Sequence, residues 1–182
     1  MRTIVFLSDK ERIMKKMLII ILLLLIVTCT KEENEDNIYS IDGYFEAYFP
    51  GEPALYKSFE NQSGSFVFYH YQEIFNNLHY VSNYVLLKEN PKDHKSFLYR
   101  IIHGTAMSWN GNVIKFEQIK HNGNHEIYYV SKTIKDGELV YECGVAAIKD
   151  SIYFQWVVEE IDGMVEAQRI FNEKVKYFKI LK

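Results

Sequence analysis

The sequence has 182 residues, a formal net charge of −3 and an aromatic content of 15%. This length is typical of a single domain. A slightly acidic chain without a cluster of Lys and Arg lacks the usual footprint of a nucleic-acid-binding protein, so we exclude that class. The two cysteines are too few for a disulfide framework, and we expect side-chain packing to hold the core.

The N-terminal segment has the features of a secretory signal peptide. Its apolar run, Met17–Val27, is 11 residues long. As a helix this run would extend about 16 Å, which is about half of a bilayer core. It follows the basic residues Lys15 and Lys16, and Met14 offers an alternative start. A short apolar run behind a basic segment is typical of a signal peptide, and we predict one over residues 1–28.

The apolar run ends at a cysteine, and the sequence Ile26-Val27-Thr28-Cys29 resembles a bacterial lipobox. The resemblance implies cleavage before Cys29 and acylation of its thiol, although Thr28 departs from the usual small residue. Two or more acyl chains hold a domain firmly at a membrane, whereas one chain binds marginally. The alternative is a buried cysteine in a short hydrophobic helix. With Cys29 acylated, Cys143 has no intrachain partner.

Behind the cysteine, the residues Lys31, Glu32 and Glu33 resemble the lipoprotein export signal of Bacteroidetes-type bacteria. The resemblance implies a lipid-anchored protein on the outer face of the outer membrane. The alternative is a solvated tether, because residues 31–37 contain no apolar side chain and are expected to be disordered. We therefore predict a lipidated cysteine and tether over 29–40, and a single domain over 41–182.

Alternating apolar and polar residues predict strands through the first half of the domain. In Gly43–Phe49, the side chains of Phe45, Ala47 and Phe49 share one face, and the turn that begins at Pro50 ends the strand. We predict strands at 43–49, 54–60, 66–75 and 78–87, the last two forming a hairpin across residues 76–77.

The period then changes to that of a helix. Pro91 and Asp93 mark its start, and Asn110-Gly111 ends it with the residue type most able to adopt a left-handed cap. The predicted buried stripe of this helix is Leu98, Ile101, Ile102, Thr105, Ala106 and Trp109.

Three further turn signals divide the rest of the domain into short antiparallel strands. We predict strands at 113–120, 125–133, 139–148 and 152–158, and a final helix at about 163–177. The buried stripe predicted for that helix is Met164, Ala167, Phe171, Val175 and Phe178. Because strands and helices are segregated along the chain, the predicted fold class is α+β, with an antiparallel β-sheet covered by two helices.

The segment that begins at Gly43 resembles the opening of PsbP-like domains, where an aromatic-rich strand runs into a Phe-Pro-Gly-x-Pro turn. The matching residues are Phe45, Phe49, Pro50, Gly51, Pro53, Gly64 and Tyr69. Segment 124–146 looks like the family's paired strands, and segment 170–181 is similar to its final helix, although Lys179 and Ile180 depart from the family pattern. The resemblance covers about residues 41–181. It implies an α/β/α sandwich with a protein-binding role and no shared catalytic residue.

His121 and His125 flank a predicted tight turn and are weak candidates for a metal site. Their rings could approach each other across a hairpin, but a catalytic zinc normally takes three protein ligands. We favour two solvent-exposed histidines, and predict no metal and no other cofactor.

Glu159, Glu160 and Asp162 form an acidic cluster before the final helix. Paired carboxylates can act in acid–base chemistry or hold calcium. The favoured interpretation is structural, with Asp162 as the N-cap of the helix, where its charge complements the helix dipole.

Cys143 shares one strand face with Leu139, Tyr141 and Val145. A nucleophilic cysteine needs a nearby base and an exposed, electropositive setting. We therefore expect Cys143 to be buried and unreactive.

Aromatic residues and histidines alternate between the two faces of adjacent strands in 66–87. They are Tyr69, His70, Tyr71, His79, Tyr80 and Tyr84. We favour core positions for both sets, because the predicted fold covers its sheet. A set left uncovered would form an aromatic platform for a partner or ligand.

The leading hypothesis for function is a non-enzymatic, membrane-anchored domain that binds a protein partner. The alternative is a lipid or small-ligand carrier with an apolar pocket between sheet and helix, and a third hypothesis is a hydrolase that uses the acidic cluster. An enclosed apolar cavity would favour the carrier, and an exposed aromatic patch would favour the protein partner. A cleft that joins a histidine to a carboxylate would favour the enzyme.

Overall fold

The computed structural model describes residues 37–73, 77–121 and 124–181, and the strands in these residues form two antiparallel sheets. The larger sheet has seven strands in the order β3-β4-β5-β9-β8-β7-β6. Their bounds are Ala54–Glu60 (β3), Gly64–Gln72 (β4), Leu78–Leu87 (β5), Asn112–His121 (β6), Asn124–Lys135 (β7), Glu138–Lys149 (β8) and Ile152–Ile161 (β9). The predicted α+β class is confirmed. The predicted signal peptide, Cys29 and residues 31–33 lie outside the described residues.

The smaller sheet has three strands, in the order β1-β2-β10. These strands are Ile38–Ile41 (β1), Phe45–Tyr48 (β2) and Lys179–Ile180 (β10). The prediction placed residues 38–40 in the tether and the strand at 43–49 in a single sheet. Instead, β1 pairs with β2 across a turn in which Asp42 and Gly43 both have positive φ, 49° and 68°. The fold therefore includes residues before position 41.

Helix α2, His94–Ser108, begins and ends where the sequence predicts. Asp93 is its N-cap and accepts a hydrogen bond from the backbone N–H of Ser96 at 3.0 Å. Asn110 takes the left-handed conformation, with φ of 52°. Gly111 is needed for a different reason, because a Cβ there would lie 2.1 Å from the carbonyl oxygen of Lys132. The backbone after α2 passes so close to β7 that only glycine fits at position 111.

The buried stripe of α2 is narrower than predicted. Leu98, Ile102 and Ala106 are buried, whereas Ile101 and Trp109 are 37% and 44% exposed and Thr105 is also exposed. The prediction of those last three core positions is wrong, because α2 packs mainly on β6, β7 and β8 and turns these residues away from the sheet.

Helix α3, Val165–Lys174, starts two residues later than predicted and continues as a 3₁₀ turn, Val175–Tyr177 (η2). The predicted N-cap, Asp162, is wrong, because it is an exposed residue with φ of 58°. Glu160 serves the helix instead. Its Oε2 accepts the backbone N–H groups of Glu166 and Ala167 at 3.0 and 2.9 Å.

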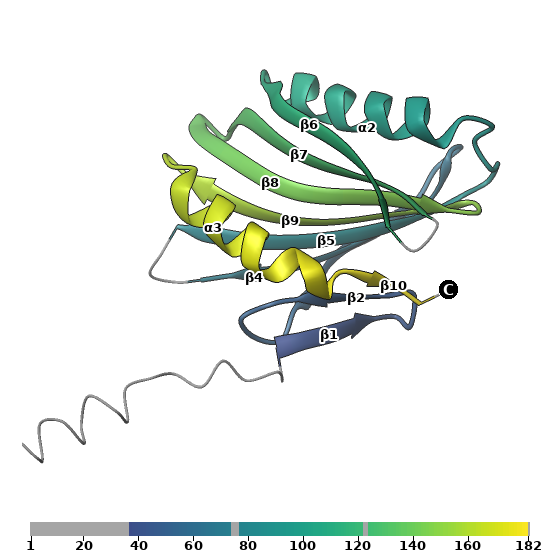
Figure 1. Ribbon diagram of the computed structural model, residues 1–182, viewed down its shortest axis with the longest axis horizontal. Helices are drawn as coiled ribbons and strands as arrows, with labels where there is room; N and C mark the ends of the chain where they lie inside the picture. Colours follow the sequence, from purple (N-terminus) through teal and green to yellow (C-terminus); the bar gives the residue numbers. More distant parts are fainter. Residues whose placement is uncertain (1–36, 74–76, 122–123, 182) are drawn as a thin grey trace, which may run out of the picture. The chain divides into compact units, whose positions relative to one another are not determined.

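The seven-stranded sheet lies between α2 on one face and α3 with the small sheet on the other (Figure 1). On the α3 face, Phe45, Phe49 and Trp156 have no exposed surface. The indole N–H of Trp156 donates to the carbonyl of Tyr48 at 2.9 Å and ties the two sheets together. On the α2 face, Leu98 and Ile102 pack over a second core cluster that contains residues of β5, β7, β8 and β9. The predicted α/β/α layering is therefore present.

Candidate functional site

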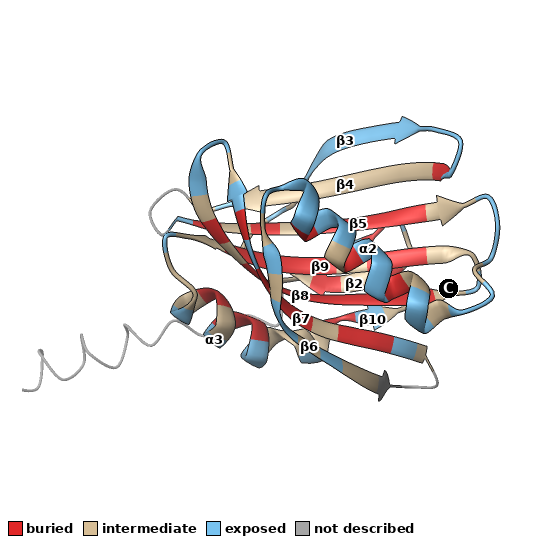
Figure 2. Ribbon diagram, turned by 90° about the horizontal axis from the view of Figure 1, so that it is seen from above, coloured by how far each residue is buried: buried red, intermediate tan, exposed pale blue. Residues whose placement is uncertain are grey.

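The α2 face of the large sheet is covered on one side only. Helix α2 packs on β6, β7 and β8, whereas β3 forms the opposite edge of the sheet. Figure 2 shows β3 exposed along its whole length and β4 at intermediate burial. The region over β3, β4 and the His79 end of β5 is therefore an open half of this face, whereas Val85, towards the other end of β5, belongs to the core cluster under α2.

Aromatic side chains gather on that open half, and we call them the aromatic strip. They are Tyr56, Phe59, Phe66, Phe68 and His70. The rings of Phe59 and Phe66 stack with centroids 4.8 Å apart, and Phe59 also stacks on Phe68 at 6.1 Å. Tyr56 is 74% and Phe59 40% exposed. Exposed contiguous aromatic surface of this kind marks interaction sites in soluble domains.

Beside the aromatic strip, polar side chains form a row across four neighbouring strands. The register places His79 opposite Glu159, Glu159 opposite Glu142, and Glu142 opposite Ser131. Residues opposite each other in antiparallel strands share a face and interact directly. We call these four residues, together with Lys135, the polar row.

Lys135 joins the two carboxylates of the polar row. Its Nζ lies 2.6 Å from Glu142 Oε1 and 2.7 Å from Glu159 Oε1. The hydroxyl of Ser131 donates to the other oxygen of Glu142, and Nδ1 of His79 is 3.9 Å from Glu159 Oε2. The side chains of Glu142 and Glu159 are only 9% and 11% exposed. A buried ion pair of this kind is costly to break, because removing one partner leaves an unpaired buried charge.

Burial dominates the electrostatics of the polar row. It raises the pKa of Glu159, an effect that Lys135 partly offsets and Glu142 reinforces. Burial acts to lower the pKa of Lys135, but the charges of Glu159 and Glu142 outweigh it and the net shift is upward. The pKa of His79 is lowered by burial and by the charge of Lys135. The row thus combines two carboxylates, one ammonium and an imidazole biased to its neutral form.

Three polar atoms on the same sheet face have no hydrogen-bond partner among the described residues. They are His79 Nε2, Asn83 Oδ1 and the hydroxyl of Tyr153. Asn83 and Tyr153 are 8% and 4% exposed. The amide of Asn83 donates to Gln155 Oε1 at 2.9 Å, so only its oxygen is left over. Buried polar atoms are normally paired, and these three lie beneath the surface without a partner among the described residues.

The polar row does not have the geometry of a nucleophilic triad. Ser131 and His79 lie on strands β7 and β5, with β8 and β9 between them. Ser131 is 1% exposed and bonded to Glu142, so a substrate cannot reach its hydroxyl in this conformation. The contact of His79 with Glu159 joins a histidine to a carboxylate, but the serine is separated from it.

The acidic cluster predicted at 159–162 is divided by the sheet. Glu159 joins the polar row on the α2 face, and Glu160 turns to the opposite face, where it caps α3. Asp162 is exposed in the turn before α3. The three carboxylates therefore do not form one site.

The two candidate metal ligands are adjacent in the β6–β7 hairpin, where His125 pairs with Lys120 and His121 with Asn124. His125 is exposed, and its Nδ1 lies 3.2 Å from Gln118 Nε2. The side chain of His121 lies outside the described part of the structure. Among the residues that the structure describes, no group of three potential ligands could hold a metal ion.

Cys143 is buried, as predicted, with no exposed surface. Burial, together with the nearby charges of Glu160 and Glu142, raises the pKa of its thiol to about 12. Such a thiol is protonated at neutral pH and is a poor nucleophile.

The predicted aromatic sets occupy the two faces differently. On the α3 face, Tyr69 and Tyr84 donate to the two carboxylate oxygens of Asp42 at 2.9 and 2.8 Å. Tyr80 donates to Glu73 at 3.0 Å, and Tyr71 packs against the same core. Tyr80 and Tyr84 are buried core residues, as predicted, whereas Tyr69 and Tyr71 are partly buried and pack against that core.

On the α2 face, His70 and His79 are only partly buried and their rings meet at 5.6 Å. A fully buried position for this second set is therefore wrong, because α2 packs near Val85, towards the other end of β5 from His79. This set continues the aromatic strip to the polar row.

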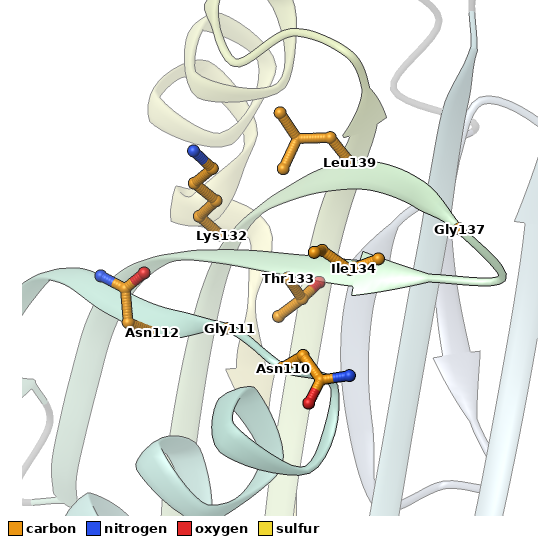
Figure 3. Close-up of a pocket in the computed structure, with 8 residues that line it drawn as sticks. All are labelled: Asn110, Gly111, Asn112, Lys132, Thr133, Ile134, Gly137 and Leu139. Carbon is orange, nitrogen blue, oxygen red and sulfur yellow. The ribbon is translucent and has the colours of Figure 1, made fainter.

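A cavity of about 490 Å³ opens between the end of α2 and the β7–β8 hairpin (Figure 3). Its lining is mixed and includes Asn110, Asn112, Lys132, Thr133, Ile134 and Leu139. The cavity is open to solvent and partly polar, unlike the enclosed apolar pocket that a lipid carrier needs.

Comparison with solved structures defines the fold. The solution structure of cyanobacterial PsbP (CyanoP) from Synechocystis sp. PCC 6803 aligns with a TM-score of 0.56 at 10% sequence identity. The alignment covers 79% of this chain and 91% of CyanoP. The fold is PsbP-like. At this identity the similarity describes the fold alone, and function has to be argued from the site.

A second solved structure aligns with a lower TM-score. It is the protein of unknown function PA94 from Pseudomonas aeruginosa, with a TM-score of 0.47, 10% identity, and coverage of 68% of this chain and 90% of that one. No protein-family model and no curated protein matches the sequence. Within the described residues, no helix is long and apolar enough to cross a membrane.

The polar row is the feature that sequence reasoning missed. Its signal was present, because Glu142 is the only charged residue between Val140 and Ile148 in a strand that is apolar on both faces. A charge at such a position requires a buried partner. Lys135, one hairpin earlier, was the available cation.

Proposed function

We propose that this chain is a non-enzymatic, membrane-anchored accessory domain that binds a protein partner through the aromatic strip. The observation that carries the proposal is the exposure of Tyr56 and Phe59 on an edge strand, beside the open half of a sheet face. Edge strands and exposed aromatic side chains are recurrent features of protein-binding surfaces.

The form of the edge favours binding by side chains over the addition of a further strand. The pairing of β3 with β4 is interrupted between Leu55 and Lys57, and Pro53 precedes the strand. Bulges, prolines and lysines on an edge strand hinder indiscriminate strand pairing. A specific partner would therefore recognise the aromatic side chains.

Membrane attachment is part of the proposal and depends on Cys29, with export directed by Lys31, Glu32 and Glu33. The motif at 26–29 supports acylation, and the domain would then stand at the outer membrane. We expect Cys29→Ser to move the chain from the membrane to the soluble fraction without a change in melting temperature. Retention of the variant in washed membranes would contradict the anchor.

The protein-binding role can be tested by removing the strip. We expect Tyr56→Ser with Phe59→Ser to reduce the size of the complex that contains this chain, measured by native electrophoresis of gently solubilised membranes. The matched control is Val165→Ser, because Val165 is 81% exposed and belongs to α3. An unchanged complex in the double variant, or an equal change in the control, would contradict the proposal.

The carrier alternative receives no support from the cavity in Figure 3, which is open and partly polar. Extraction of the purified chain followed by mass spectrometry of the organic phase would still detect a carried lipid. A stoichiometric lipid would favour the carrier over the protein-binding role.

A further inference from the structure

We propose that the open half of the α2 face binds an extended segment of the partner protein that places an arginine side chain beside Glu159 and His79. This inference rests on the proposed protein-binding function and adds the chemistry of the partner.

The polar row has more negative than positive charge. Glu142 and Glu159 are both bonded to the single ammonium of Lys135. An uncompensated buried carboxylate is unfavourable, so a bound cation would complement the row. The excess charge gives this surface a preference for a basic partner group.

The hydrogen-bonding capacity of the row is also incomplete at the end nearest the aromatic strip. Glu159 uses Oε1 for Lys135, but its Oε2 is 3.9 Å from His79 Nδ1, which is beyond hydrogen-bonding distance. His79 Nε2 has no partner among the described residues. Although His79 Nε2 is itself buried, the side chain of His79 is 24% exposed, so a cationic group can approach the ring and Glu159 from the open half.

A guanidinium suits this position better than an ammonium. It carries several N–H donors in a plane, is weakly hydrated and stacks on aromatic rings. His70 borders His79 with ring centroids 5.6 Å apart. The strip already accommodates a cation at its outer edge, where Lys57 Nζ lies 5.2 Å from the centroid of Phe59.

Asn83 defines the direction of the bound segment. Its Oδ1 is unpaired and its side chain lies on the same face of β5 as His79, four positions along the strand. Four residues of a strand span about 13 Å. An extended segment with an arginine at His79 would pass Asn83 about four residues further along, where Oδ1 lies just beneath the surface.

The test uses the purified full chain in detergent and a capped five-residue peptide that has one arginine among leucines. We expect saturable binding by calorimetry. The same peptide with citrulline in place of arginine should bind about tenfold or more weakly, because charge-assisted hydrogen bonds are lost. Glu159→Gln should weaken binding of the arginine peptide by a similar factor, whereas Glu89→Gln, at an exposed position, should have no effect.

Melting curves of each variant establish that the domain is folded before the affinities are compared. Equal affinity for the arginine and citrulline peptides, or full affinity in Glu159→Gln, would overturn the inference. Binding of the free guanidine agmatine as tightly as the peptide would overturn the choice of a polypeptide occupant. A partner complex that requires Tyr56 and Phe59 but is insensitive to Glu159→Gln would overturn this inference while leaving the proposed function intact.

Discussion

The two faces of the seven-stranded sheet are built in different ways. The α3 face is closed by a helix and a small second sheet, and its largest side chains, Trp156 among them, have no exposed surface. Helix α2 covers mainly β6, β7 and β8 and the Val85 end of β5 on the other face, and the central strands carry the polar row. One face therefore holds the fold together, and the other combines partial burial with exposed aromatic and charged groups.

This difference suggests that the α3 face mainly stabilises the fold and that the α2 face carries the groups available for function. On the α3 face, the chain's own elements cover the apolar side chains, and Tyr69 and Tyr84 donate hydrogen bonds to Asp42. This face needs no partner protein to cover it. The α2 face retains unpaired polar atoms and exposed rings that its own elements do not cover. Because the two faces are built so differently, substitutions on them should have different effects on stability.

The largest effect is expected on the closed face. Trp156→Ala should lower the free energy of unfolding by about 3–5 kcal/mol, because it removes a fully buried indole and leaves a cavity. Phe59→Ala, on the open face, should cost less than about 1 kcal/mol, because 40% of that side chain is already exposed. Urea unfolding of the full chain measures both, and similar losses in the two variants would remove the distinction between the faces.

A somewhat smaller effect is expected in the polar row. Lys135→Met should lower the free energy of unfolding at pH 7 by about 3 kcal/mol, because two nearly buried carboxylates lose their common partner. Adding Glu159→Gln to that variant should recover part of the loss, since one buried charge is removed with it. If the double variant is less stable than the single one, the unpaired charge of Glu159 is not what destabilises Lys135→Met.

The pH dependence of stability should give the smallest but most specific effect. The pKa of His79 is lowered below its ordinary 6.5. Its contribution to stability is therefore complete above about pH 6.5 and is lost as the pH falls through the lower folded pKa. The pH dependence for Glu159 has the opposite sign, because its pKa is raised above 4.5. The contribution of Glu159 to folding stability is therefore present at low pH and is lost as the pH rises through its folded pKa.

The contributions of His79 and Glu159 can be separated by measuring the melting temperature of single variants across the pH range. His79→Asn should flatten the loss of stability below pH 6.5, and Glu159→Gln should flatten the loss that begins above pH 4.5. Glu89→Gln, an exposed substitution, serves as the control and should leave both slopes unchanged. Slopes that remain unchanged in His79→Asn and Glu159→Gln would mean that these groups do not titrate with shifted pKa values.

The comparison of the faces also explains what could be predicted from the sequence. Alternation at Phe45, Ala47 and Phe49 predicts a strand with one buried face, and the structure confirms that these residues are fully buried. Turn signals such as Asp136 and Gly137 mark the hairpins, and both residues have positive φ, 50° and 87°. Local periodicity and turn chemistry thus predicted the strands of the large sheet and both helices.

Features that depend on the order of the strands could not be predicted in this way. His79 becomes a neighbour of Glu159 only because β9 lies between β5 and β8. The exposure of Ile101 and Trp109 depends on where α2 lies on the sheet, although their spacing is that of a buried stripe. The second sheet depends on β10, whose two residues are too few to give a periodic signal.

The central claim is that the aromatic strip contacts a protein partner at the membrane, and site-specific photocrosslinking in intact cells tests it most directly. A photoreactive phenylalanine analogue would be placed at Phe59 on the strip or, in a separate variant, at Val165 on α3, which is 81% exposed. The account predicts a discrete adduct of defined mass from position 59, lost in the Tyr56→Ser background, and no such adduct from position 165. The absence of an adduct at position 59, or an equal yield of the same adduct at both positions, would contradict the account.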